Sequence, residues 1–86
     1  MNNKHRKTLR DIFHNPIKAS IVWADIEKLL LALGAEVIER DGSRVAVILN
    51  QVKTTFHRPH PEKTTDKGAV KSIRLFLKNA GVDKNA

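Results

Sequence analysis

The chain has 86 residues, enough for one small domain. Sixteen Lys and Arg against nine Asp and Glu give a formal net charge of +7, which favours a polyanionic partner. Nucleic acid is the leading candidate, and an acidic protein is the alternative. Cysteine is absent, which excludes disulfides and cysteine zinc sites. No apolar run approaches the roughly 18–20 residues of a membrane span, and the polar N-terminus does not resemble a secretory signal, so we expect a cytoplasmic protein without a membrane partner.

The first 18 residues form a basic segment. Residues 4–13 contain strong helix formers with a weak apolar stripe, made of Leu9, Ile12 and Phe13. A turn signal that includes a proline follows and ends this segment. We therefore predict a basic arm or short helix over residues 1–18 and a single domain over residues 19–83.

Residues 21–34 contain the clearest helix. Its apolar residues recur on one face at helical spacing, and they are Val22, Ile26, Leu29, Leu30 and Leu33. Ser20 offers an N-cap, although the start could slip to Trp23, which we expect to be half-buried. Gly34 is placed to end the helix.

Three strands are expected next, over residues 35–40, 44–50 and 52–58. β-Branched residues flank Asp41-Gly42, which is a strong hairpin signal, and a second turn falls at Asn50-Gln51. In the third strand apolar and polar residues alternate, as a half-buried strand requires. Two prolines then end the strand.

The last helix begins near Lys67, with Thr65 or Asp66 as its cap and Gly81 as its stop. Its expected apolar face consists of Val70, Ile73, Phe76, Leu77 and Ala80. The order of elements predicts an α+β fold. Two helices should cover one face of a three-stranded antiparallel sheet, with a short extra helix at the N-terminus.

The strand pairing predicts a small exposed site on the other face of the sheet. A two-residue turn at Asn50-Gln51 sets Arg44 opposite His57. A turn shifted by one residue still leaves both side chains on the same face. Lys53 alternates onto this face as well.

These residues fit RNA cleavage without a metal or cofactor. A general base would remove the proton of a 2′-hydroxyl, and a cation would stabilise the charge that develops on the phosphate. Histidine suits the first role because its unperturbed pKa is about 6.5, and arginine suits the second. His57 is the first candidate for the base, His60 is the second, and Arg44 is the candidate cation.

Other interpretations of the two histidines stay open. His57 could be an ordinary exposed strand residue, and His60 a loop residue that bonds to the backbone. A metal site is a further alternative, but no third ligand lies near the pair in the sequence.

The last helix carries a basic stripe beside its apolar face. Its members are spaced 4, 3 and 4 residues apart, and they are Lys67, Lys71, Arg74 and Lys78. With Lys53, they are candidates for contacts to the phosphates of RNA, and DNA is not excluded. The alternative is a solvated basic face.

The pattern over residues 21–82 resembles the HicA toxin family. The resemblance rests on a helix that ends in Leu-Gly, followed by "EVIERDGSRVAVIL", "FHRPHP" and "KGAVKSIRLFLKNAGV". Its most specific parts are Gly-Ser at 42–43, Pro-His at 59–60 and the final helix. The resemblance implies a double-stranded-RNA-binding-like α-β-β-β-α fold, cleavage of messenger RNA, and a HicB-like antitoxin as partner.

The chain departs from the family pattern at one position. HicA toxins typically place their catalytic histidine directly after Gly-Ser, where this chain has Arg44. Arginine stays protonated in proteins and cannot act as an ordinary general base. Either His57 or His60 supplies the base beside Arg44, or the chain binds RNA or its antitoxin without cutting.

Overall fold

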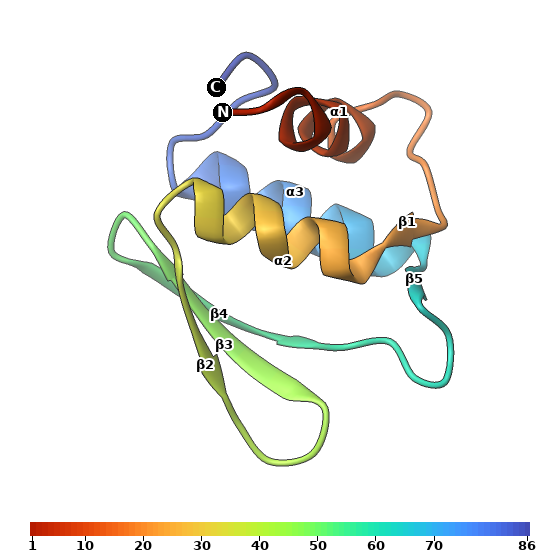
Figure 1. Ribbon diagram of the computed structural model, residues 1–86, viewed down its shortest axis with the longest axis vertical. Coiled ribbons are helices and arrows are strands. Elements are labelled where there is room, and N and C mark those ends of the chain that lie inside the picture. The colour runs from red at the N-terminus through yellow and green to blue at the C-terminus, as the bar shows by residue number, and fades with distance from the viewer.

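An antiparallel sheet and two helices packed on one of its faces form the main body of the protein. In the computed structural model, which describes residues 1–86, the strand order is β2-β3-β4. The strands span Glu36–Glu39 (β2), Arg44–Leu49 (β3) and Val52–His57 (β4). The helices are α2 (Trp23–Ala32) and α3 (Lys67–Asn79), and Figure 1 shows both lying above the strands. The predicted α+β fold is confirmed.

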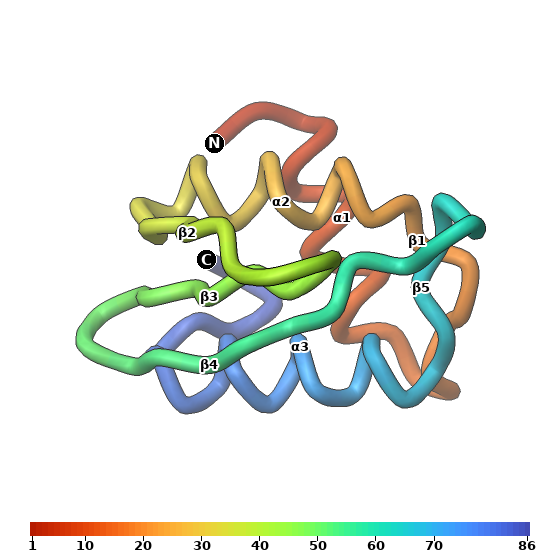
Figure 2. The backbone as a smooth tube through the Cα atoms, turned by 90° about the horizontal axis from the view of Figure 1, so that it is seen from below, coloured from red at the N-terminus to blue at the C-terminus, as the bar shows by residue number.

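The helices and the outer strands are arranged in pairs. Helix α2 packs against β2, and α3 packs against β4. Figure 2 shows the same arrangement from the side of the sheet, with β3 between the two outer strands. Strand β4 therefore forms one edge of the sheet and runs beside α3.

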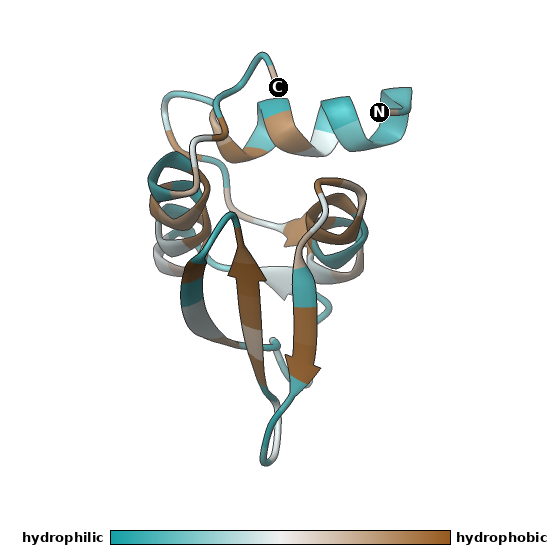
Figure 3. Cartoon of the chain, turned by 90° about the vertical axis from the view of Figure 1, so that its left-hand side faces the viewer, coloured by the Kyte–Doolittle hydropathy of each residue, from teal (hydrophilic) through white to brown (hydrophobic).

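Helix α1 (Asn3–Ile12) forms a third layer. Figure 3 shows it lying across α2 and α3 on the side away from the sheet. The side chain of Asn2 accepts a hydrogen bond of 2.8 Å from the His5 N–H and so caps this helix. Leu9 is 1% exposed and Ile12 is fully buried, so the predicted apolar stripe packs into the core.

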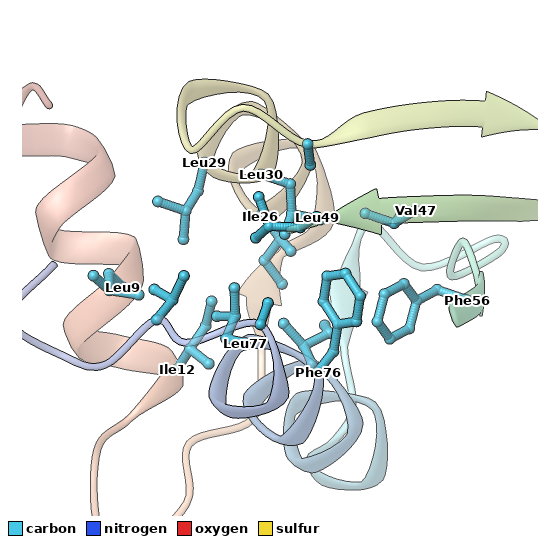
Figure 4. Close-up of a cluster of buried hydrophobic side chains, with 14 of the residues drawn as sticks. Leu9, Ile12, Ile26, Leu29, Leu30, Val47, Leu49, Phe56, Phe76 and Leu77 are labelled. Carbon is cyan, nitrogen blue, oxygen red and sulfur yellow. The ribbon is translucent and has the colours of Figure 1, made fainter. Parts of the chain in front are cut away.

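The hydrophobic core joins all three layers. Figure 4 shows side chains from α1, α2, α3 and the sheet meeting in a single cluster. Phe56 of β4 makes edge contacts with Trp23 and Phe76, at centroid distances of 6.1 Å and 5.6 Å. Each large apolar side chain buried in this way contributes about 1.5–3 kcal/mol. The predicted apolar face of α3 is buried in full.

The predicted start of α2 at Ser20 is wrong, and the alternative start at Trp23 is confirmed. Ile21–Val22 form a short strand, β1, that pairs with β5 (Thr64–Thr65). The N-cap of α2 is Val22, and the N–H of Ser20 donates to the carbonyl of Thr65 at 2.8 Å. β-Branched residues disfavour a helix, and the pairing with β5 satisfies their backbone groups instead.

The side chains at this end of α2 also differ from the prediction. Val22 was expected on the apolar face of the helix, but it precedes the helix and is 40% exposed. Trp23 was expected to be half-buried and is only 6% exposed. Strand β1 replaces the first predicted turn of the helix. Trp23, and not Val22, is therefore the buried residue at this end of α2.

The turn between β3 and β4 determines the register of the site. Asn50 and Gln51 have φ values of 49° and 69°, as the favoured two-residue hairpin turn requires. Asn50 Nδ2 also donates to the carbonyl of Ala80 at 2.7 Å, which ties this hairpin to the end of α3. The resulting register pairs Arg44 with His57, as predicted.

The ends of α3 follow the sequence closely. Asp66 is its N-cap and accepts a hydrogen bond of 2.7 Å from the Ala69 N–H, whereas Thr65 lies in β5. Gly81 follows the helix with a φ of 83°, a left-handed conformation that glycine adopts without strain. None of the helices is long and apolar enough to cross a membrane.

Candidate functional site

The sheet face away from the helices carries an exposed pair of cationic and imidazole side chains. Arg44 and His57 are direct neighbours across β3 and β4, and both are exposed. Directly opposed side chains have Cβ atoms about 4.5–5.5 Å apart. Lys53 lies on the same face of β4 and is also exposed. The structure therefore brings these three predicted residues onto one surface.

Arg44 is free to meet an anion. Its closest carboxylate is that of Asp41 in the hairpin turn, at 3.9 Å, and both side chains are well exposed. Exposed ion pairs of this kind contribute only about 0–1 kcal/mol. A phosphate that approaches the sheet would therefore displace a weak contact.

A groove runs beside the free edge of β4. It has a volume of about 630 Å³, and both His57 and His60 line it. The N-cap of α3, Asp66, and two residues of its N-terminal half, Ala69 and Ser72, line the same groove. Arg44 does not line it, so His57 is the residue shared by the groove and the outer face of the sheet.

The chain gathers no cluster of three or more His, Cys, Asp or Glu side chains that could hold a metal ion. The groove is shallow enough to be reached from solvent, and it offers hydroxyl groups from Thr54, Thr64 and Ser72.

Arg58 anchors the segment that carries both histidines. Its Nε donates to Glu27 Oε1 of α2 at 2.6 Å, and its two terminal nitrogens bind the carboxylate of Glu39 in β2 at 2.6 and 2.5 Å. Glu27 Oε1 also accepts from Trp23 Nε1 at 2.6 Å. The hydrogen bonds that Arg58 donates to Glu39 and Glu27 raise its pKa. This bidentate arrangement fixes the chain between His57 and Pro59 to both neighbouring elements.

Sequence reasoning missed Arg58, although a signal was present. In β4, Phe56 points to the helices and His57 points away, so Arg58 returns to the helix side. A charged side chain on that side requires a partner. Glu27 and Glu39 were available, but their distance from Arg58 could not be known before the helices and strands were placed.

The ion pair between Arg58 and Glu39 makes the free energy of unfolding depend on pH in the acidic range. The hydrogen bond from Arg58 lowers the pKa of Glu39 below its ordinary range. A carboxylate with a lowered folded pKa stabilises the fold above its unfolded pKa, and this contribution is lost as pH falls through the folded value. We expect the free energy of unfolding of Glu39→Gln to fall less than that of the wild type between pH 6 and pH 3. Chemical denaturation at each pH measures this difference, and Glu36→Gln, on the same strand but without an ion pair, should behave as the wild type does.

The predicted basic stripe of α3 divides into two parts. Lys67, Lys71 and Lys78 are exposed. Arg74 instead binds the C-terminal end of α1, where its Nε donates to the Ile12 carbonyl at 2.8 Å and its Nη2 to the His14 carbonyl at 2.6 Å. Arginine near these carbonyls satisfies acceptors that the end of the helix leaves open.

The stripe and the groove occupy different sides of α3. Ser72 lines the groove and follows Lys71 in sequence, and consecutive residues point about 100° apart around a helix. Arg74, at the other flank, faces α1. The structure therefore does not bring the lysine stripe next to His57 and His60.

Arg74 is expected to matter for stability more than the lysines of its stripe. Arg74→Gln should lower the free energy of unfolding by about 1–3 kcal/mol, because it removes charged hydrogen bonds to α1. Lys71→Gln, the matched control on the same helix, should change it by less than about 0.5 kcal/mol. Urea denaturation of both variants measures the difference, and equal effects would contradict this assignment.

Comparison with known proteins identifies the family. A family model described as the HicA toxin of bacterial toxin-antitoxin matches residues 23–82. The chain belongs to the HicA toxin family. No curated protein and no solved structure matches this HicA chain.

Membership of the HicA family implies a toxin of a toxin–antitoxin system, with a HicB-like antitoxin as partner and RNA as target. The matched region begins at the first residue of α2 and ends just after α3. It contains every candidate site residue of this HicA chain, whereas α1 and β1 lie outside it.

Proposed function

We propose that this HicA toxin is a messenger-RNA interferase that cleaves RNA without a metal, with His57 as the general base. The observation that supports the proposal is the direct cross-strand pairing of His57 with Arg44 on the exposed sheet face. A base and a cation held side by side on a rigid sheet are the parts that this reaction needs.

The reaction begins when the imidazole of His57 accepts the proton of a ribose 2′-hydroxyl. The 2′ oxygen then attacks the adjacent phosphorus, and the bond from phosphorus to the 5′ oxygen breaks. The guanidinium of Arg44 stabilises the negative charge that the phosphate gains during the attack. His60, the other imidazole that lines the groove, gives a proton to the leaving 5′ oxygen. The products are a 2′,3′-cyclic phosphate and a 5′-hydroxyl end.

In our proposal the general base lies on a different strand from the histidine that the family resemblance implies. The resemblance to HicA toxins implies a histidine at the position of Arg44, and arginine cannot replace it as a base. His57 is the residue directly opposite on the neighbouring strand. Moving an imidazole across one strand pair shifts it by only about 5 Å, so the base and the cation can exchange places around the same phosphate.

Further cations would hold the RNA backbone. Lys53 shares the face of His57, and Lys67, Lys71 and Lys78 are exposed on α3. We propose these lysines as phosphate contacts, which position RNA without reading its sequence. Arg74, a further candidate from the sequence, donates to the end of α1 and to the turn that follows it, and would contribute less.

The proposal is tested by incubating the purified protein with a messenger RNA in the presence of EDTA. We expect fragments that carry a 2′,3′-cyclic phosphate and a 5′-hydroxyl. Expression of the chain without an antitoxin should also arrest growth. Intact RNA after long incubation would contradict the enzymatic proposal.

A second candidate is a module that binds RNA or the antitoxin without cutting. The arginine at position 44 and the exposed lysines of α3 favour it. It predicts RNA affinity that falls steeply as salt rises, with no cleavage products. A cyclic phosphate at a new RNA end would exclude this candidate.

A further inference from the structure

The outer edge of β4 carries unpaired backbone groups. The two-residue turn makes Leu49 and Val52 a hydrogen-bonded pair, and such pairs alternate along an antiparallel ladder. The N–H of Arg58 donates to the Ser43 carbonyl at 2.8 Å, which agrees with this alternation. The intervening residues of β4 therefore direct their N–H and C=O groups away from β3, and they are Lys53, Thr55 and His57.

This edge is open to another chain. Lys53, Thr55 and His57 are all exposed, and the strand contains no proline. Proteins usually protect edge strands by shortening, bending or covering them, because a free edge pairs readily with other strands. The opposite edge, β2, has only four residues, whereas β4 presents six in a regular ladder.

The surface beside the edge can receive side chains. A hollow of about 230 Å³ lies between β4 and α3, and its lining includes Val52, Phe76 and Leu75. Leu75 is 59% exposed, which is the highest exposure of any large apolar side chain in the protein. If a further strand paired with β4, every second side chain of that strand would point toward this hollow. One apolar side chain at such a position would cover Leu75.

The charges beside β4 indicate which kind of polypeptide can bind to this edge. Lys53 lies on the edge, and Lys71 and Lys78 lie on the exposed surface of α3 on either side of Leu75. A second copy of this chain fits poorly. Antiparallel pairing centred on Thr55 would set Lys53 opposite His57 of the copy, and each copy carries a net charge of +7. An acidic segment is complementary to the same surface.

We propose that β4 accepts an additional strand from an acidic protein partner, whose apolar side chains cover Leu75. The added strand pairs with the free backbone groups of Lys53, Thr55 and His57, the mode of recognition known as strand addition. Because His57 belongs to this edge, the bound strand also covers the proposed base. Covering the base would inhibit cleavage, and this inhibition rests on the proposed function. The binding of the strand does not rest on it. The antitoxin is the natural source of the strand.

Two substitutions at Thr55 separate backbone pairing from side-chain effects. Thr55→Pro removes an N–H that makes no bond to β3, and proline is tolerated at such edge positions. Thr55→Val keeps the N–H and a side chain of similar shape. The probe is a seven-residue peptide that alternates glutamate with valine, and the control peptide alternates lysine with valine.

For the wild type, we expect the glutamate peptide to slow hydrogen exchange of the Lys53, Thr55 and His57 amides at least tenfold. Thr55→Val should bind this peptide as the wild type does, and Thr55→Pro should bind at least tenfold more weakly. Equal binding by Thr55→Pro, equal binding of the lysine peptide, or protection confined to α3 would overturn the proposal. A short single-stranded RNA that protects the same three amides while the glutamate peptide does not would assign the edge to RNA instead.

A second pair of variants keeps the test valid if Thr55→Pro does not fold. Leu75→Ser removes the exposed apolar contact beside β4, and Leu31→Ser is its control on α2, where Leu31 is 56% exposed. Only Leu75→Ser should weaken binding of the glutamate peptide, and equal effects of the two would overturn the proposal. Cleavage of RNA without peptide is measured separately. Cleavage without peptide binding would overturn the docking inference alone, and peptide binding without cleavage would overturn the enzymatic proposal alone.

Discussion

Replacing His57 with alanine is expected to slow RNA cleavage by about 10²–10⁴-fold, which is the usual contribution of a positioned general base. His57 is exposed on an edge strand, so its truncation should leave the fold intact. The rate of appearance of cyclic-phosphate ends measures the effect. Growth after expression of the variant provides a second measurement, because an inactive toxin should no longer arrest cells.

The control for this variant is His5→Ala, since His5 lies on α1 and does not line the groove. It should cleave RNA at the wild-type rate. If His57→Ala is as active as the wild type, His57 is not the base, and His60→Ala becomes the decisive variant. If neither histidine variant loses cleavage activity, neither His57 nor His60 is the base.

An exchange of the two paired residues tests the proposed move of the base. The double variant Arg44→His/His57→Arg places an imidazole at position 44, where we propose that other HicA toxins carry their base, and keeps a cation opposite it. It should recover a large part of the activity that His57→Ala loses. Arg44→Ala alone should cost about 10²–10³-fold, the range seen when a group that stabilises transition-state charge is removed. A swapped variant as inactive as His57→Ala would contradict the exchange of roles.

Truncation of Leu9 is expected to have the largest effect on stability outside the family region. Leu9→Ala should lower the free energy of unfolding by about 2–5 kcal/mol, because it leaves a cavity between α1 and the rest of the core. Leu9 is only 1% exposed and belongs to the same cluster as α2, α3 and the sheet. Such a loss is a large fraction of the about 5–15 kcal/mol that stabilises a typical protein.

Leu31→Ala is the matched control, since the substitution is the same but Leu31 is 56% exposed on α2. It should change the free energy of unfolding by less than about 0.5 kcal/mol. Urea denaturation of both variants gives the comparison. If Leu9→Ala were equally mild, α1 would be a loosely attached arm and the remaining helices and sheet would be stable without it.

Much of the fold was predictable because its signals are local. The apolar face of α3 follows from residue spacing alone, and all five predicted members are buried. The Asn50-Gln51 turn determines the β3–β4 register through backbone geometry, and so it determines that Arg44 meets His57. The start of α2 was the exception, because Ile21 and Val22 pair with residues more than 40 positions later.

The candidate site was predictable only on the sheet. Alternation along β4 placed His57 beside Arg44, but nothing in the sequence fixed the path of the loop that carries His60. The structure folds that loop back so that both histidines line one groove. The basic stripe of α3 followed helical spacing, yet spacing could not reveal that Arg74 turns to α1.

The amino-acid sequence by itself determined the three helices apart from the start of α2, the strands β2, β3 and β4, the register of the β3–β4 pair and the resemblance to HicA toxins, because each depends on residues close together along the chain. The tertiary structure alone decided which charged side chains form hydrogen bonds within the protein. Arg58 meets Glu27 across 31 residues, and Arg74 meets the Ile12 carbonyl across 62. Such contacts depend on how the layers pack against one another, and no local pattern encodes that packing. They leave His57, Arg44 and the exposed lysines free for the proposed contacts to RNA, and the edge of β4 free for the proposed partner.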